Sequence, residues 1–271
     1  MAVCALVSAR VRDKALFNPV WDVEDLLDPA SEIFYDAAGN ICASMGAKQE
    51  GSHDLMRACS LQALTAIQYG RIRDMQTYLG NYHTLVAMDG LHDETNWPQD
   101  IGIIEIEERR RLVRAMFRTL RVLMFEQFWS MYTLDIFTSI VWNGVIRCRE
   151  QQSNVSYPTE LDDELISDQG YNQEVTSPVD IGPSPGDRPG VVKGSSWLCG
   201  WNFTTDLYRL LEHVIIHFRD RKRHRRTFIN RVFGDATIVS ASSVKDDIMA
   251  MYANLPQCFK EIKDITYDTS R

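Results

Sequence analysis

The sequence lacks paired cysteines. Its six cysteines are scattered singly, and none has the short spacing of a Cys-x2-Cys metal motif. We therefore expect buried thiols, and no metal or cofactor held by this chain. The six residues are Cys4, Cys42, Cys59, Cys148, Cys199 and Cys258.

An excess of positive charge is also missing. Lysine and arginine total 29 against 37 acidic residues, giving a net charge of -8. Because affinity for nucleic acid depends on neutralising phosphates, this balance argues against a nucleic-acid binder as a whole. Hydrophobic runs long enough for a membrane span are absent. The apolar residues 1–9 are short and have no basic leader, so we expect no signal peptide.

Two motifs typical of enzymes are absent. The sequence contains no glycine-rich phosphate loop and no Gly-x-Ser-x-Gly elbow around a nucleophilic serine. These absences favour a protein that is not an enzyme.

Helical periodicity is the main signal that is present. We expect an all-α, multi-helical domain. A short link at Gly70 predicts that two of its helices form an antiparallel hairpin. The last helix is interrupted at Pro256. The expected helices span residues 2–17, 30–38, 54–69, 73–88, 128–142, 206–218 and 243–263.

One segment has the composition of a linker. Residues 167–196 are rich in proline, glycine and serine, and within residues 177–190 only Val179 and Ile181 are sizeable apolar residues. Little apolar burial is available there to offset the entropy of ordering, which predicts a disordered linker. We expect a helical domain at residues 1–166, and a C-terminal helical part of the same domain at 197–271.

The stretch from Glu105 to Glu164 organises the rest of the chain. Between Phe128 and Trp142, apolar side chains fall on every helical face, which predicts a helix buried on all sides. The dipeptide Asn143-Gly144 predicts a turn that ends this helix.

Four segments of this stretch carry a resemblance to a known family. In order, they are Arg109-Arg110-Arg111-Leu112, Phe128-Trp129-Ser130-Met131-Tyr132-Thr133-Leu134-Asp135, Ile146-Arg147-Cys148-Arg149 and Tyr157-Pro158-Thr159-Glu160-Leu161-Asp162-Asp163-Glu164. Together they resemble the fungal-specific transcription factor domain, the middle regulatory region of fungal binuclear zinc-cluster (Zn2Cys6) activators. The resemblance covers most of residues 1–165 and, more weakly, the helix from Trp201 to Phe218.

The resemblance implies a regulatory domain that acts in the nucleus. Its partners would be the transcription machinery or a small-molecule inducer, and a homodimer is possible. In this family, DNA is read by the zinc cluster, which this chain lacks, so DNA contact would need that missing module.

The chain departs from the family pattern at residues 113–127. The family joins the arginine run directly to the aromatic run, whereas fifteen residues separate them here. If helical, they would add about 22 Å along the axis and a rotation of about 60° beyond four turns. The insertion could be a helical extension or an in-frame intron that was not spliced out. The chain could therefore also be a truncated domain, a non-functional fragment or a mis-spliced product.

A basic run follows the helix at residues 206–218. We expect it to serve nuclear import or phosphate contact, and the alternative is a solvated helix end whose cations favour the negative end of the helix dipole. Its basic residues are Arg219, Arg221, Lys222, Arg223, Arg225 and Arg226.

The competing functional class is a helical metal-dependent enzyme. His213 and His217 have the i, i+4 spacing that can hold a metal, but no glutamate follows the first histidine, so helical packing is the favoured interpretation. Asp162 and Glu164 are expected to form an exposed acidic turn. For Arg109–Arg111, ion pairs with the preceding glutamates of the same helix are the expected role.

Overall fold

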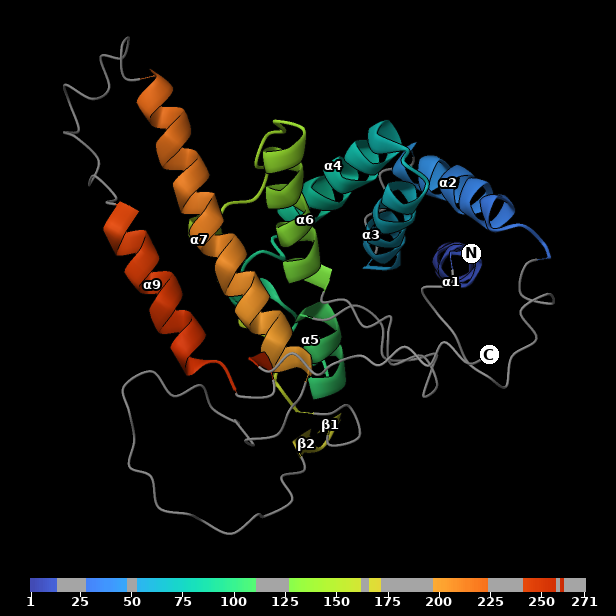
Figure 1. Ribbon diagram of the computed structural model, residues 1–271. Coiled ribbons are helices and arrows are strands. Elements are labelled where there is room, and N and C mark those ends of the chain that lie inside the picture. The colour runs from blue at the N-terminus through green and yellow to red at the C-terminus, as the bar shows by residue number, and fades with distance from the viewer. Residues whose placement is uncertain are drawn as a thin grey trace, which may run out of the picture. The chain divides into compact units, whose positions relative to one another are not determined.

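The protein is mainly helical in its computed structural model (Figure 1). The structure describes residues 1–13, 28–47, 53–110, 127–161, 166–171, 197–223, 241–256 and 259–260. In these ranges the named strands are only β1 (Ile166–Ser167) and β2 (Gly170–Tyr171), which form an antiparallel pair. The predicted all-α fold is confirmed. The chain divides into two compact units, Met1–Ser156 and Tyr157–Arg271.

Three helices open the first unit. They are α1 (Ala2–Arg12), α2 (Ser31–Ala47) and α3 (His53–Gln68). Small residues let α1 approach its neighbours closely, since Ala5 and Ala9 are fully buried. Leu6 packs with Ala38 of α2 and Leu61 of α3 in one hydrophobic cluster. Burial of these apolar side chains stabilises the three-helix contact.

The prediction for α2 was wrong in length. The glycine at Gly39 suggested a break after residue 38, but the helix continues to Ala47. A side chain at Gly39 would place its Cβ only 2.6 Å from the Tyr78 hydroxyl. The glycine therefore serves close packing inside the helix.

A helical hairpin follows, as predicted. Helix α4 (Ile72–Met88) packs against α3 across the short link at Gly70, whose φ of 67° suits glycine. Gly90, with a φ of 65°, follows the end of α4, and the Leu91 amide donates to the Val86 carbonyl at 2.9 Å. Such bonds satisfy carbonyls that the helix end leaves open.

The described residues of the last part of the first unit, from 94 to 152, form two α-helices and two short 3-10 turns. They are η1 (Glu94–Asn96), α5 (Ile103–Arg110), α6 (Gln127–Val141) and η2 (Glu150–Gln152). Every residue from 128 to 136 is buried, which confirms a helix covered on all faces over that length. The prediction was wrong for the last turn, because Ile140, Val141 and Trp142 are exposed. Asn143, with a φ of 53°, ends the helix as expected.

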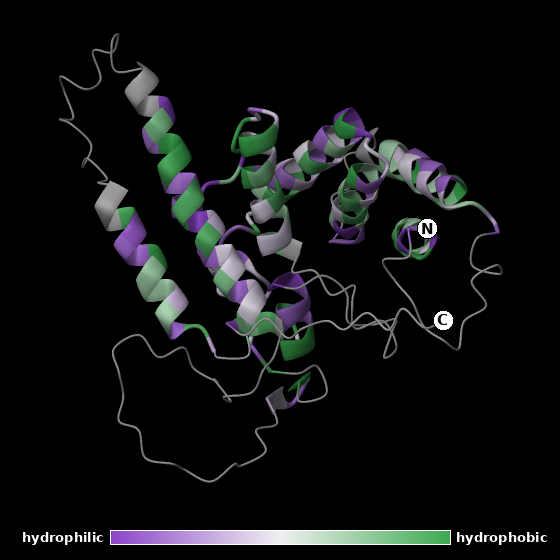
Figure 2. Ribbon diagram, in the orientation of Figure 1, coloured by the Kyte–Doolittle hydropathy of each residue, from purple (hydrophilic) through white to green (hydrophobic). Residues whose placement is uncertain are grey.

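In its described residues, the second unit contains β1, β2 and the helices α7 (Trp197–Arg223) and α9 (Ala241–Asn254), which lie side by side (Figure 1). Helix α7 is longer than predicted, and hydrophobic and hydrophilic residues alternate along it (Figure 2). Helix α9 ends before Pro256, as predicted.

Most of the predicted linker, residues 172–196, lies outside the described residues, so the domain division at residue 166 remains a prediction. The search of the described helices for one long and apolar enough to cross a membrane found none.

Candidate functional site

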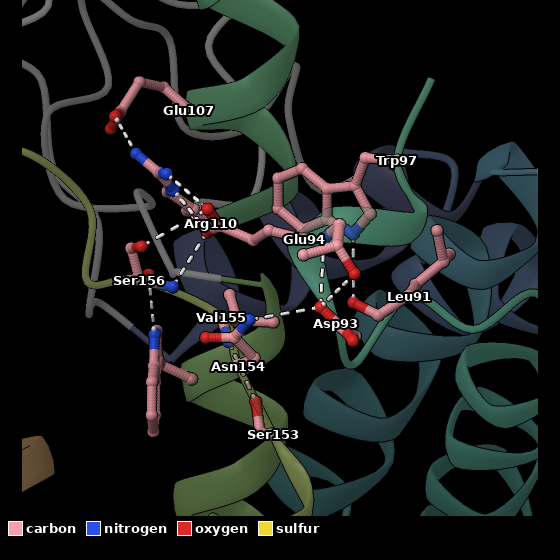
Figure 3. A network of polar contacts seen from close by, with 12 residues as sticks. Leu91, Asp93, Glu94, Trp97, Glu107, Arg110, Ser153, Asn154, Val155 and Ser156 are labelled. Atoms are coloured by element: carbon pink, nitrogen blue, oxygen red, sulfur yellow. Dashed lines mark hydrogen bonds and ion pairs between the residues drawn. The ribbon is translucent and has the colours of Figure 1, made fainter. Parts of the chain in front are cut away.

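Arg110, from the arginine run that carries part of the resemblance, enters a network of polar contacts in the first unit (Figure 3). Arg110, the last residue of α5, donates two hydrogen bonds of 2.8 and 2.7 Å to the Glu94 carboxylate of η1. Ser156 donates to the same carboxylate through its backbone N–H at 2.8 Å and its hydroxyl at 3.2 Å. Three segments that are separate in the sequence are thereby tied together.

This network is partly buried. The side chains of Glu94 and Arg110 are 21% and 16% exposed, and that of Glu107, which accepts a bond from Arg110 at 3.1 Å, is 4% exposed. Burial alone would raise the pKa of the Glu94 carboxyl. The hydrogen bonds and charge of Arg110, with those from Ser156, outweigh it and lower that pKa. The carboxylate is therefore stabilised in its charged form.

Local ion pairing of the arginine run was predicted and is confirmed for two of its members. Arg109 binds Glu105 at 2.7 Å and Arg110 binds Glu107. The contact of Arg110 with Glu94 was missed, because periodicity within one helix carries no signal for a partner outside it. Arg111 lies outside the described residues.

A second set of contacts holds the chain ahead of α5. Asp93 accepts hydrogen bonds from the Thr95 backbone N–H at 3.0 Å and from the Asn154 amide at 3.2 Å. The Trp97 indole N–H donates to the Leu91 carbonyl at 3.2 Å. These bonds fix the segment that presents Glu94 to Arg110.

The aromatic signature residues pack against one another and contact this network through Trp129. Phe128, Trp129 and Tyr132 of α6 are each at most 4% exposed, and their rings meet edge to face at centroid distances of 5.3 and 5.5 Å. The Trp129 indole N–H donates to the Ser156 carbonyl at 3.2 Å. Ser156 is therefore bonded on its N–H, hydroxyl and carbonyl groups.

Asp135, the acidic signature residue, forms a separate buried ion pair. Its fully buried carboxylate accepts hydrogen bonds from the Arg147 backbone N–H at 2.5 Å and from the guanidinium at 2.6 Å. Arg147 also donates to the Gln76 side chain of α4. Burial raises the pKa of Asp135, and the hydrogen bonds and charge of Arg147 offset only part of that rise. The pair joins α4, α6 and the chain beyond α6.

A buried histidine lies close to this ion pair. His83 of α4 is 9% exposed, and neither ring nitrogen makes a hydrogen bond of normal geometry. Burial, followed by the positive charge of Arg147, lowers the pKa of His83 to about 3, although the Met131 backbone favours the protonated ring. The ring is therefore neutral at physiological pH. Nothing in the sequence distinguishes His83 from a surface histidine.

In the second unit, the described part of residues 157–164, which we call the acidic exit, packs on α7. The Tyr157 hydroxyl donates to Asp206 at 2.5 Å and accepts from Arg209 at 2.8 Å. The Asn202 amide donates to Glu160 at 3.1 Å. These contacts give the exit segment a structural role, whereas Asp162 and Glu164 lie outside the described residues.

The remaining predicted residues do not converge on one site. His213 is exposed and His217 is half-buried on α7. Arg219, Arg221, Lys222 and Arg223 belong to the last turns of that helix, and Arg225 and Arg226 are outside the described residues. In the described part of the chain, no group of three or more histidine, cysteine or acidic side chains could hold a metal ion.

The arrangement around α6 positions segments of the chain. The signature side chains that the structure describes are engaged in internal packing, hydrogen bonds or ion pairs. Comparisons with models of protein families, with curated proteins and with solved structures found no match to this chain.

Proposed function

We propose that the chain is the regulatory domain of a fungal transcription factor of the zinc-cluster type and lacks the DNA-reading module. It acts in the nucleus, has no chemistry of its own, and relays an inducer signal or contacts the transcription machinery. The proposal rests on the resemblance of the signature segments, and the helical fold agrees with it.

The observation that best supports the proposal is that hydrogen bonds and ion pairs link signature residues from separate segments of the chain. Trp129 and Arg110 come from separate signature segments. Trp129 donates a hydrogen bond to the Ser156 carbonyl, and Arg110 binds Glu94, which also accepts a hydrogen bond from the Ser156 N–H. Asp135 is likewise held by Arg147 from a third segment. A scaffold for transmitting a signal needs such links, whereas a catalytic group must reach a substrate.

A reporter assay tests the regulatory role. The chain would be fused to a DNA-binding module of known operator, and expression of a reporter behind that operator would be measured in a fungal host. We expect a change of at least about tenfold, which corresponds to about 1.4 kcal/mol in the underlying equilibrium. An unchanged reporter, with the fusion intact in the nucleus, would contradict the proposal.

Matched variants connect that assay to the network. Glu94→Gln should reduce the regulatory effect, because it weakens the link between Arg110 and Ser156. Glu105→Gln alters a glutamate whose side chain is 44% exposed and which pairs with Arg109 of the same helix, so it should leave the effect unchanged. Equal effects of both variants would show that the network does not carry the signal.

Nuclear location has its own test. A fluorescent fusion in which the basic run is replaced by alanine should leave the nucleus, while replacement of the exposed Arg73 on α4 should not alter its location. Unchanged location of the first variant would reject the import role. Its substitutions are at Arg219, Arg221, Lys222, Arg223, Arg225 and Arg226.

The origin of residues 113–127 is a separate proposal, because only Gln127 lies in the described part of the chain. Transcripts that join the codons of Leu112 and Phe128 directly would support a retained intron. Transcripts that always contain the intervening codons would support a helical insertion.

A further inference from the structure

Two cysteines that are distant in the sequence lie at the crossing of α2 and α3. Cys42 of α2 is 6% exposed and Cys59 of α3 is 1% exposed, and both are free thiols. The spacing of these residues matches no cysteine motif. The fold alone brings them together.

The register of the two helices explains their meeting. The Gln62 amide of α3 donates to the Tyr35 carbonyl of α2 at 2.8 Å, and a Cβ on Gly39 would lie 3.6 Å from the same amide. One turn beyond Gly39 on α2 is Cys42, and one turn before Gln62 on α3 is Cys59. Because the two helices run in opposite directions here, one turn on from Gly39 and one turn back from Gln62 place Cys42 and Cys59 next to each other.

The two sulfurs lie close enough for the Cys59 thiol to act as a hydrogen-bond donor to Cys42. The bond from the Cys59 thiol lowers the pKa of Cys42 against the opposing effect of burial. The same bond, together with burial, raises the pKa of Cys59. Cys42 is therefore the sulfur that more readily becomes the nucleophilic thiolate.

We propose that Cys42 and Cys59 are a modification site, which a peroxide oxidises to a disulfide between α2 and α3. The Cys42 thiolate attacks a peroxide oxygen, the O–O bond breaks, and a sulfenic acid forms. The Cys59 sulfur then attacks the Cys42 sulfur and displaces the hydroxyl group as water. Each thiol loses one proton, and the two electrons reduce hydrogen peroxide to two molecules of water.

The surroundings of the pair suit this reaction. A disulfide needs an S–S distance of about 2.03–2.05 Å and Cα atoms about 4.4–6.8 Å apart, so the two helix backbones must be close. Helices α2 and α3 are in direct contact, since the Gln62 amide of α3 reaches the Tyr35 backbone carbonyl of α2 at 2.8 Å. Cys42 keeps 6% of its surface exposed and Cys59 keeps 1%, so Cys42 is the more accessible of the two to a small oxidant.

Peptide mapping of the purified full chain tests the proposal, which does not depend on the proposed function. The reduced protein is treated with hydrogen peroxide under native conditions, remaining thiols are alkylated, and tryptic peptides are analysed by mass spectrometry. Trypsin places Cys42 in residues 15–48 and Cys59 in residues 58–71. We expect these two peptides to be joined, with a loss of two hydrogens, and to separate on reduction.

Variants identify the sulfurs involved. Cys42→Ser and Cys59→Ser should each abolish the joined peptide, whereas Cys148→Ser, which alters another buried cysteine, should retain it. Because either serine variant could alter folding, each is compared with wild type by circular dichroism before oxidation. Full alkylation of Cys42 and Cys59 after peroxide treatment of the native protein would overturn the proposal, as would their separate oxidation without a joined peptide.

Discussion

Replacement of Glu94 by glutamine gives a sharp test of the network in Figure 3. The Glu94 carboxylate accepts two hydrogen bonds from Arg110 and two from Ser156. Glutamine keeps one acceptor oxygen and turns an N–H group toward donors, so about two of these bonds are lost. At about 1.5–3 kcal/mol for each bond to a charged group, the loss before relaxation is about 3–6 kcal/mol.

Partial hydration reduces that figure. Glu94 and Arg110 keep 21% and 16% of their side-chain exposure, and Glu107 still neutralises Arg110. We therefore expect the free energy of unfolding to fall by about 2–4 kcal/mol. With a urea dependence of about 2 kcal/mol/M, the midpoint moves down by about 1–2 M. Fluorescence of the buried Trp97 and Trp129, with circular dichroism, would follow the transition.

The pH dependence has a definite sign. Because the folded-state pKa of Glu94 is lowered, the stability from its charge is present above the unfolded pKa of about 4.3 and is lost as pH falls through the folded pKa. The difference between wild type and Glu94→Gln should therefore be largest near pH 7 and should shrink in acid.

The control is Glu105→Gln, which removes an i, i+4 pair whose glutamate is 44% exposed and whose arginine is 12% exposed, and which should cost about 0.3–1 kcal/mol. A loss for Glu94→Gln no larger than that of the control would refute the reasoning, as would a difference that does not shrink below pH 4.

Three further variants test other contacts, each by urea unfolding. Wild type should lose about 1.4 kcal/mol of its free energy of unfolding between pH 7.5 and 5.5, because His83, with a pKa of about 6.5 in the unfolded chain, is protonated there but stays neutral in the folded protein. His83→Gln should abolish this loss. Arg147→Met should cost about 3–5 kcal/mol at pH 7 by leaving the Asp135 carboxylate buried without a cation, and less at pH 4.5, because the raised pKa of Asp135 makes protonation of the carboxyl easier in acid. Gly39→Ala should be about 1–3 kcal/mol less stable than Gly80→Ala. The new methyl group at position 39 would lie 2.6 Å from the Tyr78 hydroxyl, whereas the one at position 80 would lie 3.9 Å from Arg147 Nε.

Each of these predictions has a clear contrary result. For His83→Gln it is a pH response equal to that of wild type. For Arg147→Met it is the same loss at both pH values. For the glycine pair it is a Gly39→Ala protein as stable as Gly80→Ala, since both alanines gain the same helix propensity.

Local patterns predicted the helices because helix formation depends on residues three and four apart. Helix α4 and the buried part of α6 were found in this way, and Gly70 and Asn143 marked turns correctly. The same reasoning ended α2 too early. Glycine disfavours a helix when only its sequence neighbours are considered. The packing of Gly39 against Tyr78 is a tertiary contact between residues far apart in the sequence, so no local pattern reveals it.

The candidate site was predicted only in part for the same reason. The resemblance pointed to Arg110 and Asp135, but it named neither Glu94 nor Arg147 as their partners. Pairs between separate elements depend on how the chain folds back on itself. Their charges look like ordinary surface charges in the sequence, so only the three-dimensional arrangement identifies them.

The hydrogen bonds of Ser156, the last residue of the first unit, restrain the movement of the chain at this point. Its backbone N–H and hydroxyl are tethered to Glu94, and its carbonyl is tethered to Trp129. A pull arriving along the main chain from Tyr157 must strain these three anchors before it can displace the chain that precedes them. Any displacement of Ser156 is therefore felt by η1 and α6 within the first unit.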